Sequence, residues 1–429
     1  MTSSTAELPL PNREQLATLY EITRSLNSTL DLDEVLENIM DRVIEVTGAE
    51  RGFLMLCEPG KDEMLFKVAR GLDRSDLETP AFQVSTTIVH EVERTRKPLL
   101  TDNAQFDPRF QRGESIMVLG LRSILCVPIL VKDRLLGLVY VDNRLQAGLF
   151  NREHLALLTA FAGQAGTAIE NARLYQVAVE KGRMEKELQM AHDIQRGLLP
   201  NTLPTLPGYE IAADWHSARE VAGDFYDCFE LDENRLGLVI ADVSDKGAPA
   251  AIFMAVARSL IRGNALSASS PEETLRQTNS LILHDTQSGM FVTVYYAIVQ
   301  PGGAITGVNA GHNRPLHFHA AQDTHEFLPR GGHPLGWFAE LPVQAVSIQL
   351  EPGDVLIFYT DGLTEAENIY GEPYGDERLV EVVRAAAQLP AADILKHILS
   401  SVSAFMGAAP PFDDTTLVVL RYTGTAGSA

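Results

Sequence analysis

The sequence predicts a multidomain α/β protein, and three observations support this prediction. The chain has 429 residues, enough for two or three domains that each bury a core of their own. Apolar runs of strand length occur in both halves, and segments with helical periodicity lie between them. An almost unbroken helical stretch, free of proline until Pro200, separates the two halves. Each half is therefore expected to fold around its own sheet.

The N-terminal half is expected to form a small α/β unit. Two helical faces come first, and an aspartate within residues 31–33 would cap the second one. The first face contains Leu16, Leu19, Ile22 and Leu26, and the second contains Leu36, Ile39, Met40 and Val43. The later expected elements are strands at 52–57 and 64–69, a helix around 87–95, the strand SILCVPILV, a hairpin turning at Asp133, and a helix over 152–169.

This order of elements resembles a GAF domain over residues 14–172. The resemblance implies an α/β sensor that binds a ligand between its sheet and lateral helices. GAF domains that bind cyclic nucleotides often carry an Asn-Lys…Phe…Asp-Glu motif, and this chain has Asn143-Arg144, Phe150 and Glu153 in loosely similar places. A cyclic nucleotide is thus one candidate, and the GAF ligand stays unidentified. Cys57 and Cys126 lie in apolar runs and are interpreted as inert core residues.

Residues 173–199 are expected to form a helical coiled-coil linker. Apolar residues fill six of eight positions on a strict 3,4 spacing, which is typical of a short parallel coiled coil and predicts a homodimer. The eight positions are Leu174, Val177, Lys181, Met184, Leu188, Ala191, Gln195 and Leu198. The alternative is a helix that packs only on the domains of its own chain. Gly182 weakens the coiled-coil pattern.

In the C-terminal half, aspartates repeatedly stand where an apolar strand begins or ends. They occur in VAGDFYD with Asp224 and Asp227, LGLVIADVSDKG with Asp242, VLIFYTDG with Asp361, and FDDTTLVVL with Asp413 and Asp414. Several buried carboxylates are costly unless a cation lies among them. Oxygen ligands without a converging Cys/His set favour Mg²⁺ or Mn²⁺ over zinc. Two such ions, about 3.5–4 Å apart, are suited to the hydrolysis of phosphate esters.

Taken together, these motifs resemble the SpoIIE/RsbU branch of the metal-dependent PPM phosphatases, relatives of protein phosphatase 2C. NAGHNRPL, GGHPLG and the lead-in AHDIQRGLLP add to the match, which gives a phosphatase domain over 200–422. The resemblance implies an α-β-β-α sandwich with two Mn²⁺ or Mg²⁺ ions at one end. The implied ligands are Asp224, Asp242, Asp361 and Asp413, with the carbonyl of Val243. The chain departs from the commonest pattern at Ala222 and Asp245, where glycines are frequent.

Other polar residues near these motifs have two interpretations each. Arg219 either clamps the substrate phosphate or pairs with an acid such as Glu220. Asp227 and Asp414 are expected to orient waters or cap turns rather than to bind metal. His312 either acts as a general acid or holds its loop by hydrogen bonds, and the loop role is favoured. The remaining histidines lack paired ligand spacing and are interpreted as solvated or core residues, namely His317, His319, His325 and His333.

The composition limits which molecules the protein is expected to bind and in which cellular compartment it is expected to work. The net charge of −22 argues against nucleic acid and anionic membranes, because both repel an acidic surface. The three cysteines, which include Cys228, form no CxxC motif and fit a reducing compartment. No signal-peptide pattern and no apolar run of about 20 residues is present. We therefore expect a cytoplasmic protein that does not enter the membrane.

The sequence thus predicts a signalling phosphatase in which a GAF sensor regulates a PPM domain acting on phosphoserine or phosphothreonine in a protein. Family resemblance implies a STAS-domain anti-sigma-factor antagonist as substrate, in a partner-switching pathway. Two alternatives stay open. One is a metal-binding but inactive interaction module, and the other is a phosphatase of small molecules.

Overall fold

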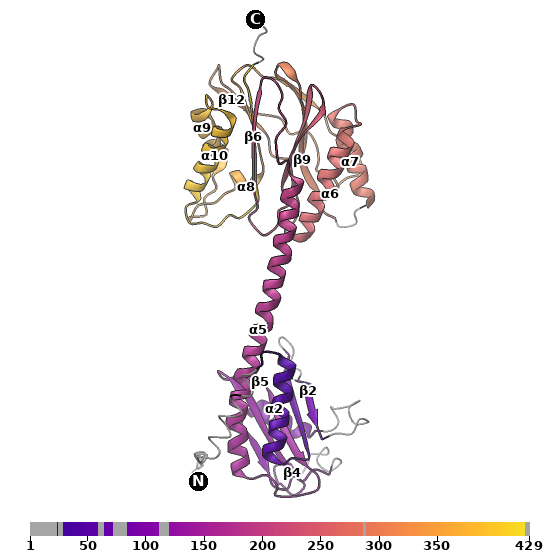
Figure 1. Cartoon of the computed structure of the whole chain (residues 1–429), viewed down its shortest axis with the longest axis vertical. Helices are drawn as coiled ribbons and strands as arrows, with labels where there is room; N and C mark the ends of the chain where they lie inside the picture. Colours follow the sequence, from indigo (N-terminus) through magenta and orange to yellow (C-terminus); the bar gives the residue numbers. More distant parts are fainter. Residues whose placement is uncertain are drawn as a thin grey trace. The chain divides into compact units, whose positions relative to one another are not determined.

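The computed structural model describes residue 24 and residues 29–58, 64–71, 84–110, 120–285 and 289–424. Contacts divide the chain into two compact units, Met1–Gly182 and Arg183–Ala429. Each unit contains sheet and helix, so the predicted multidomain α/β class is confirmed (Figure 1). The helical face expected at residues 16–26 lies outside the described residues, except for residue 24.

The first unit is a five-stranded antiparallel sheet with strand order β2-β1-β5-β4-β3. Its strands are β1 (Arg51–Cys57), β2 (Met64–Arg70), β3 (Leu99–Thr101), β4 (Ser123–Val131) and β5 (Arg134–Asn143). One core lies between the sheet, α2 (Leu32–Thr47) and the first part of α5 (Arg152–Leu198). A second core lies between the sheet and α3 (Thr86–Thr95). The expected elements within the described residues are therefore present.

Local sequence explains the ends of these elements. Asp31 caps α2, because its side chain accepts hydrogen bonds from the backbone N–H groups of Asp33 and Glu34. The β4–β5 hairpin turns at Lys132 and Asp133, which both adopt a positive φ, as a tight hairpin turn requires. Both features agree with the sequence predictions.

The second unit is a sandwich of two five-stranded antiparallel sheets, with orders β13-β10-β9-β8-β7 and β12-β11-β14-β15-β6. The first sheet comprises β7 (Phe225–Asp232), β8 (Arg235–Val243), β9 (Val292–Val299), β10 (Ala304–Ala310) and β13 (Val346–Gln349). The second comprises β6 (Tyr209–His216), β11 (Leu316–His319), β12 (Thr324–Phe327), β14 (Val355–Tyr359) and β15 (Thr415–Tyr422).

Helices cover both outer faces of the sandwich (Figure 1). The first sheet is covered by α6 (Ala248–Ala265) and α7 (Pro271–Asp285), and the second by α9 (Gly375–Ala386) and α10 (Ala391–Met406). The short elements η3 (Pro301–Gly303) and α8 (Asp361–Thr364) lie in connections. Apolar residues alternate along the strands between the interior of the sandwich and the helical layers. The predicted α-β-β-α sandwich is confirmed.

The predicted linker is part of α5, which begins in the first unit and ends in the second. Leu174, Val177 and Met184 are exposed. Their side chains are therefore accessible to a second helix, as the predicted coiled coil requires. Gln195 differs from the prediction. Its side chain is buried, donates to the carbonyl of Ala222 and accepts from the amide of the same residue. Gln195 therefore anchors α5 to the sandwich, and its assignment to the coiled-coil seam is corrected.

Among the residues that the structure describes, no helix combines the length and the apolar character that a membrane crossing requires.

A buried ion pair in the first unit leads to a stability prediction. The guanidinium of Arg51 donates two hydrogen bonds to Asp142, of 2.8 and 2.6 Å, and both side chains are at most 1% exposed. Asp142→Ala would leave a buried guanidinium without its carboxylate, so we expect it to lower the free energy of unfolding by about 3–5 kcal/mol. Urea denaturation of the full chain measures this change.

The matched control breaks a partly exposed ion pair in the same unit. Glu170 accepts two hydrogen bonds from Arg134, whose side chain is largely exposed. Glu170→Ala should therefore change the free energy of unfolding by no more than about 1 kcal/mol. Equal changes in the free energy of unfolding for the two substitutions would show that the buried pair contributes no more to stability than the partly exposed pair.

Candidate metal centre

The fold gathers the predicted aspartates at strand ends on one side of the sandwich. Because β7 and β8 are antiparallel, Asp224, just before β7, and Asp242, near the end of β8, lie at the same edge. In the second sheet, β14 and β15 are likewise antiparallel. Asp361, which follows β14, and the pair Asp413-Asp414, which precedes β15, therefore share one edge as well.

Two hydrogen bonds join Asp224 to the opposite sheet. The hydroxyl of Thr416 on β15 donates to Asp224 Oδ2 at 3.3 Å, and Trp215 Nε1 on β6 donates to the carbonyl of Asp224 at 2.9 Å. Asp224 is only 2% exposed. This carboxylate is thus fixed between the two sheets before any cation binds.

Asp414 holds the loop that leads to Asp224. Its two oxygens accept hydrogen bonds of 2.8 Å from the backbone amides of Ala218 and Gly223. Asp413 in turn accepts from the amide of Asp414 at 3.0 Å. Asp414 is therefore engaged by backbone donors, as its predicted role in the turn requires.

The carboxylates strongly perturb one another. Burial and the charge of Asp242 raise the pKa of Asp224 well above its ordinary value. The pKa of Asp242 is raised to about 7, because burial and the charges of Asp361, Asp413 and Asp414 outweigh the lowering effect of a hydrogen bond with Asp224. Burial followed by the charge of Asp413 raises the pKa of Asp361. The cluster therefore holds protons or cations at neutral pH.

Lys246, which follows Asp245 in the turn after β8, is a site residue that was not predicted. Its Nζ donates to Asp413 Oδ2 at 2.9 Å and to the carbonyl of Phe412 at 3.3 Å. The ammonium also lies 4.4 Å from the centre of the Phe412 ring. The only signal in the sequence was a lone cation in the acidic motif DVSDKG. Lys246 supplies a positive charge at the rim of the cluster.

The structure shows the surroundings of the two departures from the commonest motif. Asp245 adopts a φ of +83°, a conformation in which glycine is the ordinary residue, and its side chain accepts from the amide of Lys246. Ala222 is buried and carries both hydrogen bonds to Gln195. At Gly223 a side chain would lie 3.2 Å from the carbonyl of Val243, the predicted backbone ligand. The close approach at this position therefore favours glycine.

His312 is positioned to hold its loop. It is buried, its Nδ1 lies 2.8 Å from the hydroxyl of Thr293, and that hydroxyl donates to the carbonyl of Asp242 at 3.3 Å. Burial lowers the pKa of His312 to about 3, so the ring is neutral at physiological pH. Asn309 also accepts from the amide of His312 at 2.8 Å. These contacts support the loop role over that of a general acid.

Asp227 requires a correction. It lies within β7, is 1% exposed, and pairs with Arg258 Nη2 at 2.9 Å and with Arg262 Nη1 at 3.1 Å. Both arginines belong to α6, so this carboxylate fastens the helix to the sheet. Its contacts do not support the expected role beside the ions. No local sequence pattern indicates this pairing, because the partners lie more than 30 residues away.

Arg219 is exposed, and its guanidinium makes no hydrogen bond or ion pair with any residue that the structure describes. It directly follows Ala218, whose amide donates to Asp414. The predicted pairing with Glu220 is therefore absent within the described chain, and the guanidinium is available to an anionic ligand.

The donor set of the aspartate cluster, carboxylates with a nearby backbone carbonyl, fits Mg²⁺ or Mn²⁺.

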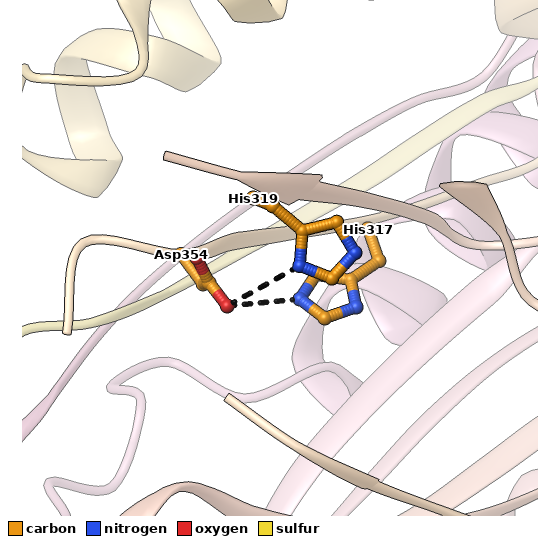
Figure 2. A group of neighbouring side chains, drawn as sticks. All are labelled: His317, His319 and Asp354. Carbon is orange, nitrogen blue, oxygen red and sulfur yellow. Dashed lines mark hydrogen bonds and ion pairs between the residues drawn. The ribbon is translucent and has the colours of Figure 1, made fainter. Parts of the chain in front are cut away.

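The structure shows His317 buried and His319 partly buried, within the predicted range of core or solvated histidines, and it also places a carboxylate beside them. His317 and His319 lie on β11 with Asp354 beside them, so that one ligand atom from each residue falls within 4.8 Å of the others (Figure 2). Sequence analysis found no paired ligand spacing here because the third residue is distant in sequence. His325 is exposed and stacks edge-on with Phe327, as expected of a solvated residue.

Comparisons with known proteins agree with this architecture. Residues 232–423 match the family model described as Stage II sporulation protein E (SpoIIE), and residues 31–169 match the GAF domain model. Protein IcfG of Synechocystis is 31% identical over an alignment of 279 residues that covers 56% of this chain and 42% of IcfG. Phosphoserine phosphatase RsbU of Bacillus subtilis is 27% identical over 241 residues, which are 56% of this chain and 70% of RsbU.

One solved structure supports the fold of the second unit. The SiaA-PP2C domain of Pseudomonas aeruginosa aligns with a TM-score of 0.51 and 21% identity, over 57% of this chain and 99% of that domain. The likeness shows a shared sandwich fold.

The raised pKa of Asp242 predicts how the stability of the metal-free chain depends on pH. The pKa is about 7 in the folded chain and about 4 in an unfolded one. Protonation of Asp242 therefore contributes stability that is fully present below pH ~4 and is lost as the pH rises to ~7. Relative to Asp242→Asn, which cannot titrate, we expect the Tm of the parent chain to fall over this range in the presence of a chelator.

Divalent ions should reverse this loss. At pH 7.5, Mg²⁺ or Mn²⁺ is expected to raise the Tm of the parent chain more than that of Asp242→Asn, because the ions replace the missing protons. Differential scanning calorimetry measures both effects. If the difference in Tm between the parent chain and Asp242→Asn is constant with pH and unaffected by the ions, the assignment of Asp242 to a metal centre is contradicted.

Proposed function

We propose that this chain, a GAF domain followed by a SpoIIE-type PP2C phosphatase domain, is a metal-dependent phosphatase acting on phosphoserine or phosphothreonine in a protein. The observation that carries the proposal is the cluster of carboxylates at one edge of the sandwich, whose shared charge requires protons or cations. The name of the relative RsbU, a phosphoserine phosphatase, supports this class of substrate.

Four side chains are proposed to hold two divalent ions, namely Asp224, Asp242, Asp361 and Asp413, with the carbonyl of Val243. When bound, such ions lower the pKa of water and polarise a phosphoryl oxygen. Thr416 keeps Asp224 oriented, and Asp414 fixes the loop before it. The chain thus presents oxygen donors on strand ends, where both sheets restrict their movement.

The substrate phosphate is proposed to meet Arg219. This guanidinium is exposed and has no partner among the described residues, and it lies one residue from the backbone that contacts Asp414. A guanidinium binds phosphate through two parallel N–H groups, which fixes the orientation of the ester. Lys246 offers a second positive charge, held at Asp413. Together they would attract a dianionic phosphoryl group to an otherwise acidic region.

The proposed partner is a phosphorylated STAS-domain anti-sigma-factor antagonist, so that dephosphorylation switches its binding partner. The resemblance to the RsbU branch supports this choice. The three cysteines are free, with Cys126 and Cys228 buried, which agrees with action in the reducing cytoplasm.

The first unit is proposed to sense a ligand that sets the activity. Two residues of the partial cyclic-nucleotide motif make contacts within the fold. Asn143 accepts backbone hydrogen bonds in a turn, and Arg144 forms an ion pair with Glu50.

Removal of a cluster carboxylate should abolish hydrolysis. We expect Asp242→Asn and Asp361→Asn to lower kcat on an aryl phosphate by at least ~10³-fold, because each variant weakens the cation cluster. Asp414→Asn should cost only ~10–100-fold, as expected of a residue that supports the ligands through the loop. Steady-state kinetics with Mn²⁺ and with Mg²⁺ measures these changes.

Two arms of this experiment separate the alternatives. Asp393→Asn, an exposed aspartate on α10, is the control and should keep parental activity. The parent chain should also release phosphate from a phosphoserine STAS protein faster than from phosphorylated metabolites. Parental turnover in Asp242→Asn would refute the centre. Inactivity of the parent on every substrate would instead indicate a metal-binding interaction module.

The exposed apolar side of α5 leads to a prediction about oligomeric state. We propose that Val177 and Met184, 66% and 56% exposed, meet a second copy of the chain in a coiled coil. Val177→Glu/Met184→Glu should convert the dimer into a monomer, since it places charges in an apolar seam. Val179→Glu changes an equally apolar, exposed residue off the seam and should leave the dimer intact. Light scattering decides, and a monomeric parent would disprove the dimer.

A further inference from the structure

His317, His319 and Asp354 form a second cluster of potential metal ligands, apart from the aspartates (Figure 2). Alternate residues of a strand point to the same side, so the two histidines of β11 face one way. Asp354 directly precedes β14, the strand that pairs with β11. Asp361 follows the other end of β14, so the two clusters lie roughly 20 Å apart along this strand, at ~3.3 Å per residue.

The distances in this cluster suit a single transition-metal ion. Asp354 Oδ2 lies 3.2 Å from His317 Nε2 and 3.7 Å from His319 Nδ1. In a tetrahedral zinc site, ligand bonds of about 2.0–2.1 Å place neighbouring ligand atoms about 3.3 Å apart. The three side chains are thus close to the arrangement that one zinc ion requires.

Hydrogen bonding without an ion leaves the cluster unsatisfied. A neutral imidazole has one donor nitrogen and one acceptor nitrogen. If His317 Nε2 donates to Asp354, then Nδ1 is an acceptor, yet Nδ1 is buried, has no hydrogen-bond partner, and lies 3.5 Å from Glu326 Oε1, another acceptor.

An ion bound at His317 Nε2 resolves the conflict. The proton then resides on Nδ1 and faces the carboxylate of Glu326. The same carboxylate lies 3.5 Å from His319 Nε2, so in both rings it faces the nitrogen that does not bind the ion. A carboxylate behind a metal-binding histidine is a common supporting arrangement in zinc sites. Asp354 is supported too, because it accepts hydrogen bonds from the amides of Ala320 and Glu351.

We propose that His317 Nε2, His319 Nδ1 and Asp354 Oδ2 bind a divalent ion of the zinc class, with water as the fourth ligand. Two imidazoles and one carboxylate suit Zn²⁺ and disfavour Mg²⁺, which prefers oxygen ligands throughout. His319 is 29% exposed and gives the ion a route from solvent. The ion would fasten β11 to the start of β14, and through Glu326 would order the hairpin with β12.

The test measures zinc binding to the full chain by equilibrium dialysis in excess Mg²⁺, which occupies the aspartate centre. The parent chain is expected to bind one zinc ion. His319→Ala and His319→Gln should each weaken this binding by ~100-fold or more, because loss of a mere supporting partner already costs 10–100-fold. His325→Ala removes a histidine of β12 that pairs opposite Phe318, on the other face, and should bind zinc like the parent.

A fourth variant separates this site from the aspartate centre. Asp242→Asn should keep the zinc ion, since it alters only the distant cluster. The proposal is overturned if the parent binds no zinc under excess Mg²⁺, if either His319 variant binds like the parent, or if zinc is lost in Asp242→Asn. In the last case the ion belongs to the aspartates, and His317 and Asp354 form only a hydrogen-bonded pair.

Discussion

Electrostatic repulsion among carboxylates at one edge of the sandwich is the constraint on which the second unit depends. Asp224 and Asp242 are held side by side by the antiparallel strands β7 and β8, Asp224 is buried, and Asp242 is partly buried. The cost of this arrangement is compensated only when protons or cations occupy the cluster. Backbone amides at Asp414 and the hydroxyl of Thr416 lower this cost without neutralising it. This crowding in the metal-free fold is the basis of the proposal that the cluster binds divalent cations.

The surroundings of the cluster show how a sandwich tolerates this strain. The apolar core between the sheets and helices is extensive, and buried ion pairs fasten its helices, as Asp227 does with Arg258 and Arg262. Gln195 attaches the end of α5 to the loop before Asp224 through Ala222. A displacement of this helix would therefore act on the backbone that carries the first carboxylate. We propose this contact as the route by which a sensor joined to α5 would influence the centre, because coupling requires an element that both sites bias.

Much of this structure could be predicted from the sequence, because local patterns specify strands, caps and turns. The apolar runs before Asp242 and Asp361 are strands, Asp31 is a helix cap, and Asp133 forms a hairpin turn. Pairings between distant residues could not be predicted, since no local pattern encodes them. This explains why Asp227 was assigned to the wrong environment, why Lys246 was missed, and why His317 and His319 were separated from Asp354. Gln195 fits the linker period, yet tertiary packing on Ala222 overrides that pattern.

We propose that the aspartate cluster is a two-ion centre, and anomalous diffraction would reveal the ions themselves. Crystals of the full chain grown with Mn²⁺, with data collected at the manganese edge, would locate each ion without reference to activity. The account predicts two peaks about 3.5–4 Å apart, with Asp242 between them and Asp224, Asp361 and Asp413 around them. A single peak, or manganese bound elsewhere while these carboxylates stay free, would contradict it.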